Sequence, residues 1–528
     1  MGLWRFRAVV QDSVHGIIPV NEAEYWLLQT PFLRRLHEVK QLGLSYLVFP
    51  SATHSRLEHS LGVMHLASRM AYRVVEASRR NSKICSALFH ACSDDVYSAF
   101  IQVARLTGLL HDVGHPPFSH MLEDSIRDIV FNPRERGVED EGILEGLEEA
   151  RKVIVESGGF VKIHDVYTRH FIERISELSE GSDYEDLNIL VRLALESVKP
   201  GFSGLRDGDL EDLGVRVEAC RLVNYMLSGS VVDIDRLDYL VRDAKYTGVV
   251  YGYIDIDRVL EGLDVVEGEG GVTIVAPPKA YQPIEDVFDA RFKMYKTVYY
   301  HHKLSSLQLA LDMAFARIVG EWWSLQPGIY SGVIEGPWEL LNPRRLSEIV
   351  KEARVYFDDP EVMSLVKTMR MKGSKTAVRW AKALLEARPL LPISLVKRMD
   401  ELVSEIVKGG EWRAEHVGKV LDNIIHDDET FKGIVERSIK TRGVDRSAVK
   451  VERVPRRIVG EVTGALKELV ERSVYLRTLI EAASIPVTLV YAYSDDEETH
   501  MKLYRERDRI RKLFTQELVR EAIGRLKS

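Results

Sequence analysis

Hydrophobic positions recur at three- and four-residue spacing along most of the chain, and this spacing predicts a mainly α-helical protein. Residues 60–74, 96–110 and 230–248 show it most clearly, and Ser93 or Asp94 can cap the second of these helices. The apolar positions in the three stretches are Val63, Leu66, Ala67, Met70, Val74, Val96, Phe100, Val103, Ala104, Leu110, Val231, Val232, Ile234, Leu237, Leu240 and Val241.

Strand-like runs are few and short, at residues 47–49, 271–276 and 486–491. Three stretches are predicted as loops or insertions: the acidic residues 131–156, the Gly- and Asp-rich residues 199–214, and residues 324–343 with several Gly and Pro. A chain of 528 residues is longer than one hydrophobic core usually serves, so we expect two domains. We place the boundary near Gly328, between a core at 1–328 and a helical C-terminal region at 329–528.

Composition narrows the class of protein. Hydrophobic residues make up 45% and charged residues 29%, and no run approaches the roughly 18 apolar residues that span a bilayer. The N-terminus lacks the apolar run and cleavage site of a signal peptide, so a cytoplasmic protein is expected. A net charge of −8 disfavours broad nucleic-acid binding but allows a local basic pocket. Three cysteines, Cys85, Cys92 and Cys220, are predicted to be reduced core thiols.

Eleven of the 16 histidines precede residue 171, so candidate chemistry concentrates in the first third of the chain. His59 continues the apolar face of residues 60–74, and a single histidine there would more often be a hydrogen-bonded core residue. Residues 106–120, LTGLLHDVGHPPFSH, change that interpretation. They end an apolar helix at His111-Asp112, where the helix dipole favours a cation, and add His115 and His120.

Residues 230–248 contain a second source of carboxylates. Asp235 lies there, and Arg236, Tyr239 and Asp243 share one helix face. The alternative interpretation of that face is a solvated, salt-bridged surface. Together with the histidines, however, Asp235 completes a set of nitrogen and oxygen donors suited to Mn, Fe, Zn or Mg. Coordination positions left open would hold a water of lowered pKa that can act as a nucleophile.

The order His59, His111-Asp112, Asp235 matches the H…HD…D signature of the HD-domain superfamily of metal-dependent phosphohydrolases. The flanking segments resemble its dNTP triphosphohydrolase branch over roughly residues 10–320, and we expect no sterile-alpha-motif domain before them. The resemblance implies an α-helical HD-domain core with a few short β-strands. The matching segments are DSVHGIIPV (12–20), TPFLRRLHEVKQLG (30–43), VFPSATHSRLEHSLGV (48–63), LLHDVGHPPFSH (109–120), DIDRLDYLVRDAKYTG (233–248) and ARFKMYKTVYYHHK (290–303).

The resemblance also implies roles for individual residues. One divalent ion (Mn, Fe, Zn, Co or Mg) would be bound by His59, His111, Asp112 and Asp235. The residues placed at the scissile phosphate are His120 as a general acid, with His164, His115 and Glu123. The triphosphate would be held by Arg56, Arg236 and Arg291, the sugar by Tyr239, Asp243 and Tyr299, and the 3′-hydroxyl and base by Gln41 and Leu42.

This sequence departs from the branch at two places. Glu123 stands where the family has an aspartate three residues after the histidine matched by His120. Gln29 and His37 occupy the positions of an aspartate and an arginine that read an activating guanine nucleotide in one branch member. We therefore expect no GTP-specific activation in that form.

The function predicted from these residues is hydrolysis of a deoxynucleoside triphosphate to a deoxynucleoside and inorganic triphosphate. The family also implies a homo-oligomer. Two alternatives stay open. The same site could hydrolyse another nucleotide or single-stranded nucleic acid, or the chain could be a non-enzymatic nucleotide-sensing scaffold whose function resides in residues 330–528.

Overall fold

The structure, a computed structural model, describes residues 4–158, 162–201, 205–229, 233–268, 271–387, 389–396, 399–439, 446–456, 470–483 and 487–527. The chain divides into two compact units, one formed by Met1–Arg291 and Gly328–Val362, the other by Phe292–Pro327, Met363–Thr463 and Val470–Ser528. The segment 328–362 therefore packs with the first unit, although it follows the boundary expected near Gly328. Within the described residues, no helix is both long and apolar enough to cross a membrane.

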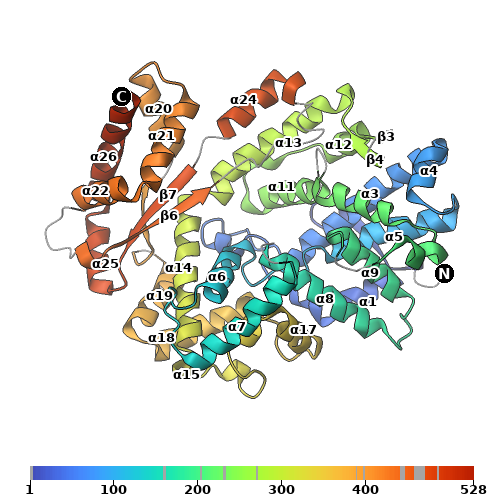
Figure 1. The fold of residues 1–528 in the computed structure, drawn as a ribbon, viewed down its shortest axis with the longest axis horizontal. Helices are drawn as coiled ribbons and strands as arrows, with labels where there is room; N and C mark the ends of the chain where they lie inside the picture. The colour runs from blue at the N-terminus through green and yellow to red at the C-terminus, as the bar shows by residue number, and fades with distance from the viewer. Residues whose placement is uncertain are drawn as a thin grey trace. The chain divides into compact units, whose positions relative to one another are not determined.

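The first unit is built around two long helices, α3 (Arg56–Arg80) and α5 (Asp94–Leu110), which pack along each other (Figure 1). Ser55 starts α3 with a capping box, accepting from the Glu58 amide while the Glu58 side chain accepts from the Ser55 amide. Ser93 caps α5, as the sequence predicted. α11 (Ile234–Thr247) packs on α3, and its left-handed Gly248 ends it. The predicted helical periodicity is confirmed, while Val231 and Val232 lie outside the described residues.

The remaining elements of this unit are shorter helices and two hairpins. They are β1 (Phe6–Asp12), β2 (Gly16–Asn21), α1 (Glu22–Gln29), α2 (Pro31–Arg35), η2 (Gly43–Leu47), α4 (Ser82–Leu88), α6 (His120–Phe131), α7 (Glu141–Glu156), α8 (Ile163–Ser179), α9 (Leu187–Val198), η3 (Asp207–Leu213), α10 (Val217–Asn224), η4 (Tyr225–Gly229), η5 (Val250–Gly252), α12 (Ile256–Gly262), β3 (Asp264–Gly268), β4 (Gly271–Val275), η6 (Pro278–Ala280), η8 (Gly328–Tyr330), α16 (Trp338–Leu341) and α17 (Pro343–Lys351). Two further helices, α13 (Tyr281–Met294) and α18 (Asp359–Lys372), begin in this unit and continue into the other.

Two local predictions are wrong. The acidic stretch 131–156, expected to be a loop, contains helix α7, because Ile143, Leu147, Ala150 and Ile154 fall on one buried face despite the surrounding glutamates. Residues 47–49 were expected to be a strand, but Leu47 ends the 3-10 helix η2 and residues 48–49 form the turn and bend that follow it. The strand predicted at 271–276 is confirmed as β4.

The hairpin β1–β2 was not predicted from the sequence. Its strands pair in antiparallel register from Phe6 with Asn21 to Asp12 with Gly16. Only one residue of β1 is buried, so the strand carries almost no apolar signal. The Asp12 carboxylate accepts from the amides of Val14 and His15, both at 2.8 Å, which closes the turn.

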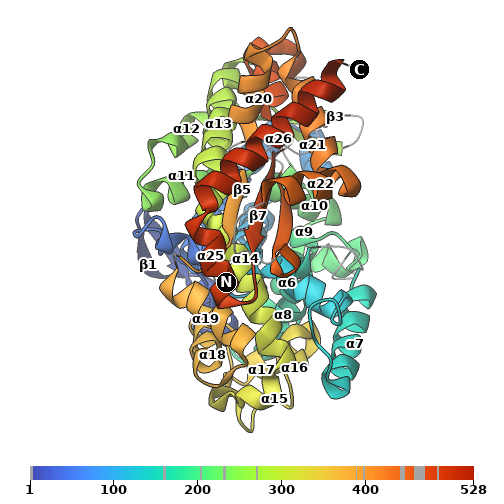
Figure 2. The ribbon, with the colours of Figure 1, turned by 90° about the vertical axis from the view of Figure 1, so that its left-hand side faces the viewer.

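The second unit contains a three-stranded antiparallel sheet in the order β5-β7-β6, with α26 packed against β5 (Figure 2). Its core joins Val490 of the central strand to Leu421, Phe514 and Leu518 of the surrounding helices. The strand predicted at 486–491 is confirmed as β7. The elements are η7 (Tyr295–Tyr299), α14 (His302–Gly320), α15 (Trp322–Leu325), α19 (Lys375–Glu386), β5 (Ile393–Val396), α20 (Met399–Lys408), α21 (Ala414–His426), α22 (Asp428–Ser438), η9 (Arg446–Ala448), β6 (Lys450–Arg456), α24 (Val474–Ala483), β7 (Val487–Tyr493), α25 (Glu497–Arg505) and α26 (Arg507–Lys527).

The cysteine prediction needs a correction. Cys85 and Cys92 form a disulfide, whereas Cys220 is a buried free thiol as expected. The chain reverses between α4 and α5, and this turn brings the two Cα atoms, seven residues apart, to 6.1 Å. Sequence spacing alone does not reveal that reversal.

Candidate active site

Side chains from three helices of the first unit come together to form a group that could bind a metal ion. His59 from α3, His111 at the end of α5 and Asp235 at the start of α11 offer ligand atoms that all lie within 4.8 Å of one another. The shortest separation, His59 Nε2 to Asp235 Oδ1, is 3.0 Å. Asp112 lies beside them, with Oδ1 3.4 Å from His111 Nε2 and Oδ2 3.6 Å from His59 Nε2.

The other ring nitrogens of these two histidines are already engaged. His111 Nδ1 lies 2.8 Å from the Gly108 carbonyl oxygen, so it must donate, and this leaves Nε2 with a lone pair. His59 Nδ1 lies 2.7 Å from Asp238 Oδ2. Within the described part of the chain, Nε2 of both rings is buried and has no hydrogen-bond partner. This carboxylate–imidazole arrangement is the one that prepares histidines for a metal ion.

Gly62 makes room for that second carboxylate. A Cβ at this position would stand 1.9 Å from Asp238 Oδ1. Asp238 can therefore sit against α3, one turn from His59, only because residue 62 has no side chain. The requirement here is close approach between two helices, not an unusual backbone angle.

The β1–β2 hairpin supports Asp238 from its other side. His15 Nε2 lies 2.7 Å from Asp238 Oδ1, and Arg242 bridges Asp238 and Asp12 with distances of 2.8 Å to each carboxylate. All four side chains are nearly or fully buried. Burial raises the pKa of Asp238, but Arg242 and the two histidines lower it well below its usual range. The carboxylate is thus held ionised behind His59.

The electrostatics of the donor group favour a positive charge. Burial alone would lower the pKa of His59, but Asp235 and Asp238 raise it to about 10. Burial raises the pKa of Asp235, and the adjacent imidazoles of His111 and His59 lower it below its usual range by a larger amount. A divalent cation satisfies the same carboxylates and uses the same nitrogen lone pairs. The residues present therefore fit a metal ion.

Asp112 is also bound to its neighbours. Arg56 Nη1 donates to Asp112 Oδ2, and His115 Nε2 lies 3.3 Å from Oδ1. Burial raises the pKa of Asp112, but His111 and Arg56 bring it well below its usual range. The predicted phosphate ligand Arg56 is thus paired with a predicted metal ligand, and its Nε donates to Ser119 Oγ at 2.8 Å.

A second cluster adjoins the first and consists of His115, His120, Glu123 and His164. Glu123 uses one oxygen for each of two imidazoles: Oε2 lies 3.0 Å from His120 Nδ1, and Oε1 lies 2.9 Å from His164 Nδ1. The rings of His115 and His164 stack at 4.1 Å. His120 is the accessible member, with 62% of its side chain exposed, whereas the other three are buried.

Close packing between two backbones brings α8, and with it His164, into this cluster. A Cβ on Gly114 would stand 2.1 Å from the Thr168 amide nitrogen, and the Gly114 amide donates to Thr168 Oγ1 at 3.1 Å. Gly114 therefore permits α8 to approach the turn at residues 111–114, here called the HD turn, because it has no side chain.

The loop that carries Gln41 and Leu42 pairs with the residues just before α3. The Gln41 amide donates to the His54 carbonyl oxygen at 3.0 Å, and Lys40 bridges Ser55. Gln41 is buried, and its Oε1 atom has no hydrogen-bond partner among the described residues. An unfilled acceptor at this depth is suited to a hydroxyl donor from a bound ligand.

The remaining predicted substrate residues are placed as follows. Arg236 pairs with Asp233 at 2.8 Å and lies over Phe288, and Arg291 is close enough to Asp233 to lower its pKa, which burial raises. Asp243 is buried and lies 2.8 Å from His54 Nε2. Tyr239 is half-buried on α11. Tyr299 belongs to the second unit, on η7.

Several residues of the site escaped prediction from the sequence: Asp238, His15, Arg242, Asp12 and His54. Asp238 and Arg242 lie four apart on α11, a spacing that indicated only a surface salt bridge. Nothing in the sequence pairs His15 with a residue more than two hundred positions away. In the sequence these residues are only charged or histidine side chains near the predicted ligands. Their contacts in the folded chain are what identify them as part of the site.

Comparisons with known proteins agree with this geometry. Residues 56–194 match the HD domain family. The chain is 31% identical over 293 residues to an uncharacterized protein of Methanocaldococcus jannaschii, which covers 56% of this chain and 46% of that protein. It is 30% identical over 352 residues to the uncharacterized protein YwfO of Bacillus subtilis, covering 65% and 64% of the two chains. It is 26% identical over 309 residues to human deoxynucleoside triphosphate triphosphohydrolase SAMHD1, covering 58% and 44%.

Each match thus spans less than two-thirds of the length of the curated relative. Two crystal structures share the fold. A hypothetical protein from Aquifex aeolicus has a TM-score of 0.51 at 22% identity, covering 96% of this chain and 99% of that chain. A phosphohydrolase from Bacteroides thetaiotaomicron has a TM-score of 0.55 at 21% identity, covering 92% and 99%. This chain therefore resembles the HD-domain phosphohydrolase superfamily, and residues 56–194 are the part that matches the HD domain.

Proposed function

We propose that this protein hydrolyses deoxynucleoside triphosphates to a deoxynucleoside and inorganic triphosphate in a metal-dependent reaction. The observation that carries the proposal is the pair of buried nitrogens, His59 Nε2 and His111 Nε2, which make no hydrogen bond among the described residues and face the Asp235 carboxylate beside the cluster around His120. The similarity to the human triphosphohydrolase supports the choice of substrate.

His59, His111, Asp112 and Asp235 would hold one divalent ion, of which Mn, Fe, Zn, Co and Mg are the candidates. When bound, such an ion lowers the pKa of a water molecule toward neutrality and offsets charge on phosphate oxygens. Asp238 orients His59 and keeps its lone pair directed at the site. Arg56 and His115 hold the Asp112 carboxylate.

His120 is the candidate general acid. Its imidazole is exposed, so substrate can reach it, and Glu123 fixes its Nδ1. The opposite nitrogen, Nε2, is the atom that would deliver a proton to the departing 5′-oxygen. Glu123 also anchors His164, so one carboxylate orients both imidazoles. Glu123 stands where the family has an aspartate, and its longer side chain contacts both His120 and His164.

The remaining residues would bind the substrate. Arg56, Arg236 and Arg291 are assigned to the triphosphate, whose oxygens suit forked cationic donors. Gln41 Oε1 can accept from the 3′-hydroxyl, with Leu42 against the base. Tyr239, Asp243 and Tyr299 are assigned to the sugar, where close packing would exclude a 2′-hydroxyl.

The experiment that tests this function is a screen of all dNTPs and NTPs with Mn, Mg, Fe, Zn and Co, with products identified by mass. We expect inorganic triphosphate and a deoxynucleoside, and slower turnover of ribonucleotides. Asp235→Ala, which removes one ligand, is the matched inactive control. Release of monophosphate or pyrophosphate would instead assign another phosphoester reaction to the same site, and no turnover under any metal would favour the scaffold alternative.

The homo-oligomer implied by the resemblance is part of the proposal. Light scattering of the purified protein, with and without a dNTP, measures it directly. The same screen includes single-stranded nucleic acid as the alternative substrate. It is the less favoured partner, because the chain has a net charge of −8.

A further inference from the structure

A buried carboxylate joins two loops of the site from a distant part of the chain. Asp359 is the first residue of α18 and is 5% exposed. Its Oδ1 accepts from the Phe118 amide at 2.6 Å, and its Oδ2 accepts from the Lys40 amide at 3.1 Å. We call this pair of contacts the Asp359 bridge.

The two loops carry different parts of the candidate machinery. Phe118 and Ser119 immediately precede His120, and Lys40 immediately precedes Gln41. Phe118 and Ser119 both have φ of +56°. Such backbone is strained in a residue other than glycine and persists only where its surroundings hold it. A hydrogen bond from the Phe118 amide to a fixed carboxylate provides that restraint.

Ser119 closes the network on its other side. Its Oγ donates to the Lys40 carbonyl oxygen at 2.7 Å and accepts from Arg56 Nε at 2.8 Å. The backbone of Lys40 is thus held on both sides, at its carbonyl oxygen by Ser119 and at its amide by Asp359. Because Arg56 also binds Asp112, the network reaches from α18 to the proposed metal site.

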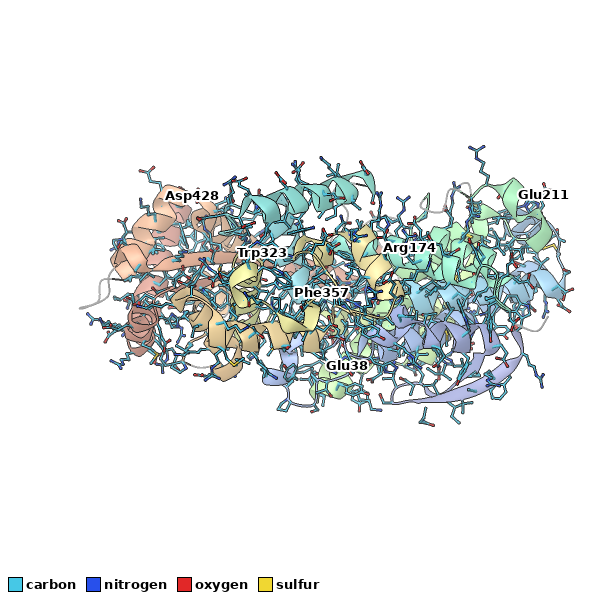
Figure 3. All side chains as sticks on the ribbon, turned by 90° about the horizontal axis from the view of Figure 1, so that it is seen from below. Glu38, Arg174, Glu211, Trp323, Phe357 and Asp428 are labelled. Atoms are coloured by element: carbon cyan, nitrogen blue, oxygen red, sulfur yellow. A yellow bond between two sulfur atoms is a disulfide. The ribbon has the colours of Figure 1, made fainter. Side chains whose placement is uncertain are left out.

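The segment before α18 is itself fixed, so Asp359 is a rigid anchor. Arg35 donates to the carbonyl oxygens of Tyr356 and Phe357, and Glu361 accepts from both of their amides. Phe357 is labelled in Figure 3. Asp358 caps α18 through the Glu361 amide at 3.0 Å. These five hydrogen bonds therefore hold the segment that presents the Asp359 carboxylate.

We propose that Asp359 is a positioning residue, whose bridge sets the His120 turn and the Gln41 loop in the one arrangement that serves hydrolysis. The proposal rests on the function assigned to His120 and Gln41 above. It gives the segment 328–362 a role in the active site, although this segment lies outside the HD-domain match at 56–194. Misplacing a catalytic group by about 1 Å costs roughly 100-fold in rate.

The test compares Asp359→Ala and Asp359→Asn with Asp358→Asn. The control replaces a neighbouring carboxylate of similar burial, and asparagine retains its helix cap. Hydrogen–deuterium exchange is measured on peptides that span residues 36–46 and 112–122, without substrate. In Asp359→Ala we expect the Lys40 and Phe118 amides to exchange at least ~10-fold faster than in the wild type, because both lose their acceptor. Asp359→Asn, which keeps one acceptor oxygen, should release only one amide.

Turnover is measured on the same preparations together with metal content. We expect kcat of Asp359→Ala to fall ~10- to 100-fold with metal content unchanged, while Asp358→Asn retains wild-type kcat. Unchanged exchange at both amides, or faster exchange with unchanged kcat, would overturn the role of Asp359. If Asp359→Ala does not fold, Asp359→Asn decides by the same two readouts. If the wild type cleaves no dNTP, the proposed function fails, and kcat is then taken on bis(p-nitrophenyl) phosphate.

Discussion

At the residue scale, His120 and the proposed metal ligands are separate in space, which makes their roles separable by mutation. His120→Ala should lower kcat about 10²–10⁴-fold, because the leaving oxygen loses its proton donor. Metal content and KM should stay close to wild type. Measuring metal, melting temperature and kcat on one preparation checks this. Loss of metal would show that His120 is a ligand, and loss of stability with normal kcat would make it a packing residue.

Asp238 offers a second residue-scale prediction, concerning metal affinity. Asp238→Asn should weaken metal binding about 10- to 100-fold, because His59 loses the carboxylate that orients it and raises its basicity. The fold is also affected, since Arg242 loses one partner, so a matched control is needed. Glu58→Gln replaces a carboxylate at the start of the same helix as His59 without touching the donor group. Titration with Mn monitored by calorimetry should separate the two variants.

The pH dependence of stability tests the burial of Asp359. Burial raises its pKa to about 7 against the hydrogen bonds from Phe118 and Lys40, with Asp358 acting in the same direction and the Lys40 side chain opposing it. Burial raises the pKa of Asp358 and Arg35 lowers it, while burial together with the Asp359 carboxylate raises the pKa of Tyr46. Because folding raises this pKa from 3.8, the contribution to stability is complete below about pH 4 and is lost as pH rises through 7.

The corresponding change in the free energy of unfolding, for a pKa raised from 3.8 to about 7, is at most about 4 kcal/mol. We therefore expect the stability of the wild type relative to Asp359→Asn to decrease between pH 4 and pH 7. Urea unfolding of both proteins across that range measures the difference. A constant difference would show that Asp359 has the same pKa in the folded and unfolded chains.

At the element scale, the active site depends on helices that pack closer than side chains allow. Gly114→Ala should separate the HD turn from α8, because the new Cβ would meet backbone atoms of Thr168. We expect a destabilisation of about 1–3 kcal/mol and a loss of turnover, since His164 is displaced. Gly524→Ala is the control, because a Cβ there meets nothing within 4 Å and alanine favours the helix. Equal melting temperatures for the two variants would contradict the proposed packing.

At the scale of the whole molecule, the proposed metal should contribute to stability. Its ligands come from α3, α5 and α11, which are distant in the sequence, so an unfolded chain cannot bind it in the same way. At a free metal concentration about 100 times Kd, binding adds about 2.7 kcal/mol. Chelation should lower the melting temperature of the wild type, and added Mn should restore it. Asp235→Ala should show a much smaller response to either treatment.

The sequence by itself determined the helical class and most of the donor set, for identifiable reasons. Apolar positions at helical spacing predicted α3, α5 and α11, because the positions on the buried face of a helix recur about every 3.6 residues. His111 and Asp112 were recognised because they are adjacent, and an ordered set of motifs joined them to His59 and Asp235. Prediction failed where the local pattern was mixed. The glutamates of α7 concealed its apolar face, and the largely exposed strand β1 has almost no pattern of buried apolar positions.

Only the tertiary structure decided what surrounds those ligands. Asp238 behind His59, His15 from the hairpin and Asp359 from α18 are brought into place by packing between segments that are far apart in the chain. The same is true of the Cys85–Cys92 disulfide, which depends on a reversal of direction. Periodicity shows which face of an element is buried, but it does not show which other segments pack against that face. The partners of a buried polar group are therefore set by the fold as a whole, and they are absent from the local pattern.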